Sequence, residues 1–145
     1  MYYIAIRDNE TADEPFIRDS LDRILGYLGE KGDFSLSFVD DTEIKALNSE
    51  YRGINAPTDI LTFRLDDDDS FPQMEDEEKE LGDVFISLDS MRRNAAEFGV
   101  EESDELRRLL LHGILHLRGM DHKSNDFSSE PMLILQERLL KEIFS

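Results

Sequence analysis

All three histidines of the 145-residue chain lie within the eleven residues HGILHLRGMDH. They are His112, His116 and His122. Imidazole binds metal ions and transfers protons near neutral pH, so the clustering leaves two alternatives. The histidines are either polar side chains scattered over a helix surface, or ligands that converge on one metal ion.

A helix over this stretch places the first two histidines together. Each helical residue turns by about 100°, so His112 and His116, four positions apart, share one face with Glu105 and Arg108. The opposite face carries apolar side chains that can pack on a core: Leu106, Leu110, Ile114 and Leu117. A metal-site helix requires an apolar face that is fixed by packing on the core and a polar face that carries the ligands.

Gly119 supplies the turn that brings the third histidine back. Glycine adopts positive φ at no steric cost and commonly ends helices, so the chain can fold across the helix end and bring His122 to His112 and His116. The chain has no cysteine and no fourth histidine. Three ligands with one open position form the catalytic type of zinc site, so we expect one Zn²⁺ per chain and hydrolysis by an activated water. Cobalt or nickel can compete in vitro, and Asp121 is placed to accept a hydrogen bond from a ligand histidine.

The spacing resembles the metzincin protease helix, H-E-x-x-H-x-x-G-x-x-H. The histidines and the glycine match, but position 113 is glycine where the proteases carry the glutamate that acts as general base. A protease is therefore disfavoured.

The remaining sequence predicts an α+β fold that positions this helix. Residues 1–145 are expected to form a single domain in which a small mixed sheet of about four strands packs with about five helices, one of them the zincin-like metal-site helix. Asp41 or Thr42 is expected to cap the second helix. Strands are predicted over residues 2–7, 34–40, 58–65 and 82–88, and helices over about 16–28, 42–52, 90–98, 102–118 and 129–144.

The net charge of −18 opposes binding to a polyanion unless a local basic site or a helper protein exists. Residues 66–80 hold nine carboxylates and one lysine, and we expect a solvated, mobile loop there, with a docking tail or a cation trap as the alternative. The absence of cysteine, of a signal-peptide pattern and of a membrane-spanning apolar run favours a cytoplasmic protein without a membrane partner.

Three motifs resemble the YbeY family of bacterial rRNA-maturation factors. HGILHLRGMDH is similar to its H-G-x-L-H-L-x-G-[YFM]-D-H signature, and residues 48–63, NSEYRGINAPTDILTF, resemble its N-x-x-Y-R block. Residues 81–87, LGDVFIS, resemble its L-G-D-I-x-I-S strand, and Met132, Gln136 and Glu137 are similar to its last helix. Arg64 departs from the family, which often has proline there, and the acidic run is longer than usual.

The resemblance implies a zinc-dependent endoribonuclease specific for single strands, acting in 16S rRNA 3′-end maturation and ribosome quality control. It implies zinc ligation by His112, His116 and His122, with Arg52, His112 and His116 as catalytic residues and no separate cofactor. Implied partners are rRNA, small-subunit proteins and a ribosome-assembly GTPase. The sequence leaves the oligomeric state and the general base open.

Simpler alternatives remain at the residue level and for the function. Arg52, at a helix end, is also placed to pair with a carboxylate, while Thr58, Asp59 and Asp83 suit turn capping and strand-end hydrogen bonds. For the function, the alternatives are a non-catalytic small-subunit assembly factor whose metal stabilises the fold, and a metal-dependent hydrolase of another substrate.

Overall fold

The computed structural model describes residues 1–7, 11–65 and 80–145. Within these residues four strands and five helices form the predicted α+β arrangement. The predicted acidic loop, residues 66–80, lies outside the described residues except for Glu80, which begins a strand rather than ending a loop. The elements are β1 (Tyr2–Ile6), α1 (Glu14–Leu28), β2 (Asp33–Val39), α2 (Asp41–Arg52), β3 (Ile60–Arg64), β4 (Glu80–Ser87), α3 (Leu88–Phe98), α4 (Glu102–Leu117) and α5 (Pro131–Phe144).

The four strands form one mixed sheet in the order β1-β2-β4-β3. β1, β2 and β4 run parallel, and β3 runs antiparallel to β4 at the edge. Because side chains alternate along a strand, each strand contributes to both faces of the sheet. Ile60 and Ile86 pair on one face, and Leu61 and Phe85 pair on the other.

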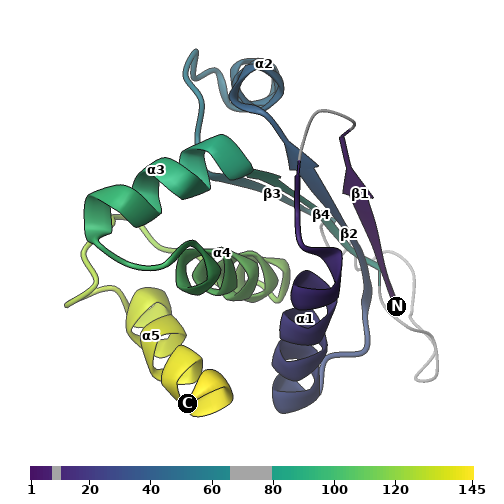
Figure 1. Cartoon of the computed structure of the whole chain (residues 1–145), viewed down its shortest axis with the longest axis vertical. Helices are drawn as coiled ribbons and strands as arrows, with labels where there is room; N and C mark the ends of the chain where they lie inside the picture. Colours follow the sequence, from purple (N-terminus) through teal and green to yellow (C-terminus); the bar gives the residue numbers. More distant parts are fainter. Residues whose placement is uncertain (8–10, 66–79) are drawn as a thin grey trace.

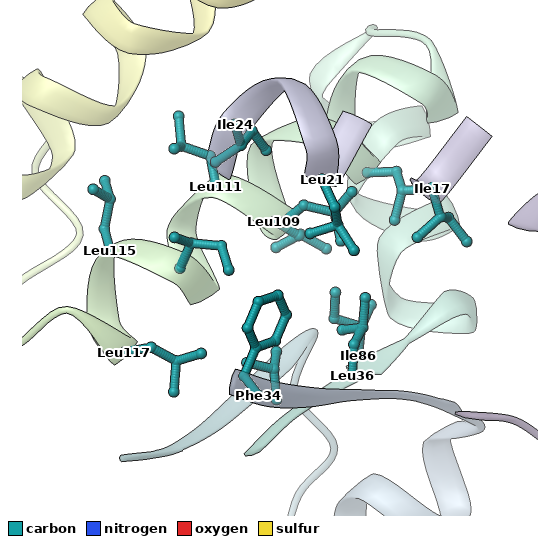
Figure 2. Close-up of a cluster of buried hydrophobic side chains, with 14 of the residues drawn as sticks. Ile17, Leu21, Ile24, Phe34, Leu36, Ile86, Leu109, Leu111, Leu115 and Leu117 are labelled. Atoms are coloured by element: carbon teal, nitrogen blue, oxygen red, sulfur yellow. The ribbon is translucent and has the colours of Figure 1, made fainter. Parts of the chain in front are cut away.

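Helices cover both faces unequally (Figure 1). α1, α3, α4 and α5 gather on one face, with α4 contacting the other three and also β3 and β4. The main core lies between α1, α4 and the sheet, where Phe34, Leu36 and Ile86 face leucine and isoleucine side chains of the two helices (Figure 2). α2 covers the other face through a smaller cluster that contains Val39, Ile44 and Leu61.

Two helix starts differ from the sequence prediction. Asp40 caps α2, and its side chain accepts a hydrogen bond from Glu43 N at 2.8 Å, so neither Asp41 nor Thr42 is the cap. α3 begins at Leu88 because Ser87, the last residue of β4, caps it. Asp40 directly follows β2 and Ser87 ends β4, and each of these residues also caps the next helix. An alternating pattern alone cannot locate such a boundary.

Among the described residues, none of the helices combines the length and apolarity needed to cross a bilayer.

Candidate metal centre

The α4 helix presents His112 and His116 from a buried support. The residues predicted to form its apolar back, Leu106, Leu110, Ile114 and Leu117, are all at most 6% exposed. Gly113, next to His112, packs directly on the sheet: a Cβ at this position would lie 3.2 Å from side-chain atoms of Ile60 and Val84. A glutamate at this position, as in the metzincin pattern, would therefore press on Ile60 and Val84 and displace them.

The turn after α4 brings the third histidine to the first two. Gly119 has φ of 103°, a conformation that side-chain-bearing residues rarely adopt, and the chain reverses there as predicted. The ring centroids of His112, His116 and His122 are 4.6 to 5.3 Å apart. One nitrogen from each ring lies within 4.8 Å of the others, so the triad could hold one metal ion.

Hydrogen bonds at the Nδ1 atoms indicate the tautomer of each of the three rings. His122 Nδ1 lies 2.8 Å from the carbonyl oxygen of Ser124, which can only accept, so this Nδ1 carries the proton. His112 Nδ1 lies 2.6 Å from Gln136 Oε1, and His116 Nδ1 lies 3.3 Å from Asp121 Oδ1. Each neutral ring therefore donates from Nδ1 and keeps its Nε2 lone pair free.

The free Nε2 atoms make the donor set fit a cation. His112 Nε2 and His116 Nε2 are 3.0 Å apart. In these tautomers neither atom carries a proton, so the two atoms cannot form a hydrogen bond with each other. Two lone pairs facing at that distance repel each other, and a cation beside them removes the repulsion. Neutral imidazole nitrogens are zinc ligands of first choice, so the residues fit Zn²⁺.

Burial keeps two of the ligand rings, His112 and His116, neutral. It lowers the pKa of His112 to about 4, and it lowers the pKa of His116 as well. The two rings are therefore unprotonated at neutral pH, the state in which they bind a metal.

A second layer of side chains holds the ligands in place. Arg64 donates to the carbonyl oxygen of His116 at 3.0 Å and to Asp121 Oδ2 at 3.3 Å, so it ties the edge strand β3 to the end of α4. Asp121 thereby has the expected role beside His116. Gln136 was matched to the family's last helix, but its role as the partner of His112 was not predicted. The available signal was a polar residue at helical spacing from Met132 and Leu133, and the structure buries it to 1% exposure.

An ion-pair network lies under the same face of α4. Glu105 is 2% exposed, and its Oε1 accepts from Arg108 Nη1 at 2.9 Å. Arg108 Nε donates in turn to Glu137 Oε1 at 2.8 Å. Burial raises the pKa of Glu105, and Arg108 offsets that cost by pairing with it. The network fastens α5, which carries Gln136, to α4.

The triad opens into a groove of about 1280 Å³, lined by Arg52, Arg64, Phe98, His112, His116 and Phe127 among others. Arg52 is exposed; its Nη2 donates to the carbonyl oxygen of Thr62 at 2.8 Å, and its guanidinium lies 5.5 Å from the Phe63 ring. Within the described residues Arg52 thus has a carbonyl and a ring as partners instead of a carboxylate. It stands beside the edge strand and faces the groove that contains the histidines.

The other family-matched polar residues make local hydrogen bonds. Asp59 accepts from Asn94 Nδ2 at 3.0 Å, and burial raises its pKa. Thr58 Oγ1 donates to the Asp59 carboxylate at 3.4 Å, and Ser35 Oγ donates to Asp83 Oδ1 at 2.5 Å. These contacts agree with the structural alternative for the three residues, which stood beside a chemical one.

Comparison with known proteins places the chain among endoribonucleases. The family model described as Endoribonuclease YbeY matches residues 4–144. Endoribonuclease YbeY of Treponema denticola is 48% identical over 110 residues, which span 76% of this chain and 70% of the relative. The Persephonella marina protein of the same name is 35% identical over 131 residues, 90% of this chain and 83% of the relative. The solution structure of TM1509 from Thermotoga maritima is similar with a TM-score of 0.63 at 28% identity, over 99% of this chain and 89% of that one.

Proposed function

The chain belongs to the YbeY endoribonuclease family, and from this membership we propose that it is a zinc-dependent endoribonuclease specific for single-stranded RNA. The observation that carries the metal part of the proposal is the histidine triad, whose Nε2 atoms are free because all three Nδ1 atoms are bonded to acceptors. Three imidazole ligands, with no fourth ligand among the described residues, correspond to a catalytic site rather than a structural one.

The histidine ligands and the side chains that hydrogen-bond to them would hold the zinc ion in a fixed geometry. His112, His116 and His122 would bind Zn²⁺, and Gln136 and Asp121 would keep two of those rings in the required tautomer and orientation. A zinc ion supplies Lewis acidity toward a phosphoryl oxygen and lowers the pKa of a bound water to about 7.

Arg52 supplies positive charge for the phosphodiester. Phosphoryl transfer depends mainly on positioning and on neutralising the charge that builds on the phosphoryl oxygens. One N–H of the guanidinium is held by the Thr62 carbonyl oxygen, and the group remains exposed in the groove. The remaining donors can bind a phosphate in the bidentate manner of arginine.

We propose rRNA of the small ribosomal subunit as the substrate, in 16S rRNA 3′-end maturation and ribosome quality control. Small-subunit proteins and an assembly GTPase are the proposed partners, and the cytoplasm is the proposed location. Family resemblance supports these assignments. A partner bound to the ribosome would also deliver an acidic enzyme, net charge −18, to an RNA that it would otherwise meet weakly.

The net charge also favours a second candidate, a non-catalytic assembly factor that binds the small subunit and uses the metal to stabilise its fold. The two candidates differ in what the metal does. An enzyme without its metal loses cleavage while it can remain folded, whereas an assembly factor without its metal loses structure first.

The test compares cleavage of a 3′ precursor fragment of 16S rRNA, and of a duplex of matched length, by the zinc-loaded protein, the chelated protein and His116→Ala. Circular dichroism and ribosome co-sedimentation report folding and binding for each preparation. We expect single-strand cleavage by the zinc-loaded protein alone, with His116→Ala folded and still ribosome-bound. Equal cleavage by a folded, metal-free protein would reject the enzyme proposal.

A further inference from the structure

Two exposed phenylalanine rings line the groove beside the histidines. Phe98 is 62% exposed and Phe127 is 49% exposed, and both line the groove that contains His112 and His116. No other phenylalanine of the described residues is exposed to this degree. Unlike tyrosine, phenylalanine has no polar atom that benefits from contact with water, so two exposed rings in one functional groove call for a ligand.

Phe98 ends a helix face that is otherwise buried. Leu88, Met91 and Ala95 lie at helical spacing on α3 and are at most 4% exposed. Phe98, three residues further along, continues that spacing but faces the groove instead of the core. α3 lies against α4, which carries His112 and His116 (Figure 1). The position of the ring is therefore set by a rigid element and not by a free loop.

Phe127 is presented by a hydrogen-bonded turn between α4 and α5. The Asp126 carboxylate accepts from Ser128 N at 2.9 Å and from Ser129 Oγ at 2.8 Å, so it bonds to the two residues that follow the ring. The same connection begins at His122, whose Nδ1 donates to Ser124 O. A ring held by a preorganised turn loses little conformational entropy when it binds a ligand.

The charge of the groove indicates which part of an RNA these rings meet. Among the described residues its cations are Arg52, Arg64 and Arg108, and the last two are already paired with carboxylates. Phosphate contacts therefore supply little affinity in a chain of net charge −18. Base stacking on aromatic rings is independent of charge and of base identity.

We propose that Phe98 and Phe127 are base-stacking positions for single-stranded RNA in the approach to the histidine triad. The inference rests on the proposed ribonuclease function and adds the residues that give strand selectivity. A base offers its face to a ring only where it is not stacked inside a duplex, so these positions favour unpaired nucleotides.

Alanine variants test the contribution of each ring. Phe98→Ala and Phe127→Ala should each raise KM for a single-stranded oligonucleotide about 5- to 150-fold, with kcat and zinc content close to those of the unsubstituted protein. Phe98→Tyr should restore most of the affinity, because a tyrosine ring stacks equally well. Tyr3→Ala is the matched control, since Tyr3 is 65% exposed on β1, the sheet edge opposite β3. KM values within about twofold of the unsubstituted protein in both phenylalanine variants would overturn the inference.

Tryptophan variants report stacking without any cleavage. The chain contains no tryptophan, so Phe98→Trp and Tyr3→Trp each introduce a single indole fluorophore. Each variant also carries His116→Ala to prevent cleavage. Titration with a single-stranded RNA oligonucleotide should quench the Phe98→Trp emission and leave the Tyr3→Trp emission unchanged. Equal responses from the two variants, or loss of ribosome binding by Phe98→Ala with oligonucleotide binding unchanged, would reject base stacking; the latter result would assign the rings to a protein partner.

The two sets of measurements separate the inference from the function on which it rests. Absence of RNA cleavage by the zinc-loaded, unsubstituted protein would defeat the ribonuclease proposal. Normal cleavage with unchanged KM in the phenylalanine variants would defeat the stacking inference alone.

Discussion

At the residue scale, Arg52 has two contacts that can be separated by substitution. Its Nη2 donates to the carbonyl oxygen of Thr62, and the same guanidinium lines the groove. Arg52→Ala should lower kcat for RNA cleavage about 100-fold, the usual cost of losing one charge-stabilising donor. Arg52→Lys should recover only part of the rate, because an ammonium cannot bind in the bidentate mode. Melting temperatures and zinc content within error of the unsubstituted protein are the control; an unchanged kcat would reduce Arg52 to a structural role.

His112 should make the stability of the metal-free protein depend on pH. Its pKa is about 4 in the folded chain and about 6.5 in the unfolded chain, so the unfolded state binds more protons between these values. The free energy of unfolding therefore has its full value above about pH 6.5. It decreases by up to about 3 kcal/mol as the pH drops toward about 4. Urea unfolding of the chelated protein measures this slope. His112→Gln, which does not titrate, should show a shallower slope in that window; an identical slope would assign the pH dependence to other groups.

At the element scale, the turn after α4 should decide whether the third ligand reaches the other two. Gly119 has φ of 103°, where any side chain introduces strain, while among the described residues a Cβ at this position would meet only Arg64 Nη1, at 3.9 Å. Gly119→Ala should therefore act through the backbone, displace His122 and weaken zinc binding about 10- to 100-fold. Gly26→Ala is the control, because that glycine lies within α1 with open space around it. Zinc affinity equal in both variants would contradict this role of the turn.

Local elements were predictable from the sequence, and their tertiary partners were not. The three histidines span only eleven residues, so helix geometry and one glycine suffice to predict that they meet. Gln136 lies 24 residues from His112, and only the packing of α5 on α4 brings the two together. In the same way the alternating patterns located the strands, but the order β1-β2-β4-β3 and the face covered by α2 depend on contacts between distant segments.

At the scale of the whole molecule, a chain of net charge −18 whose described groove residues include one unpaired cation should bind RNA with a weak dependence on salt. Single-stranded binding loses about 0.7 in log K per decade of salt for each neutralised phosphate. Arg52 is the unpaired cation of the groove among the described residues, so one neutralised phosphate is expected and the slope for the zinc-loaded protein should be about −0.7. Fluorescence anisotropy with a 2′-O-methyl oligonucleotide from low to high salt measures it. A slope steeper than about −4 would indicate an extended cationic surface, contrary to base stacking as the main source of affinity.

Three imidazoles from one helix and its terminal turn should hold a single cation, and the proposed chemistry depends on that ion. The decisive experiment is metal analysis of the purified protein beside its His122→Ala variant, with circular dichroism to show that both are folded. We expect about one zinc per chain in the unsubstituted protein and a small fraction of that in the variant. A folded protein without bound zinc, or a variant that retains zinc at the same stoichiometry and affinity, would contradict metal binding by the triad.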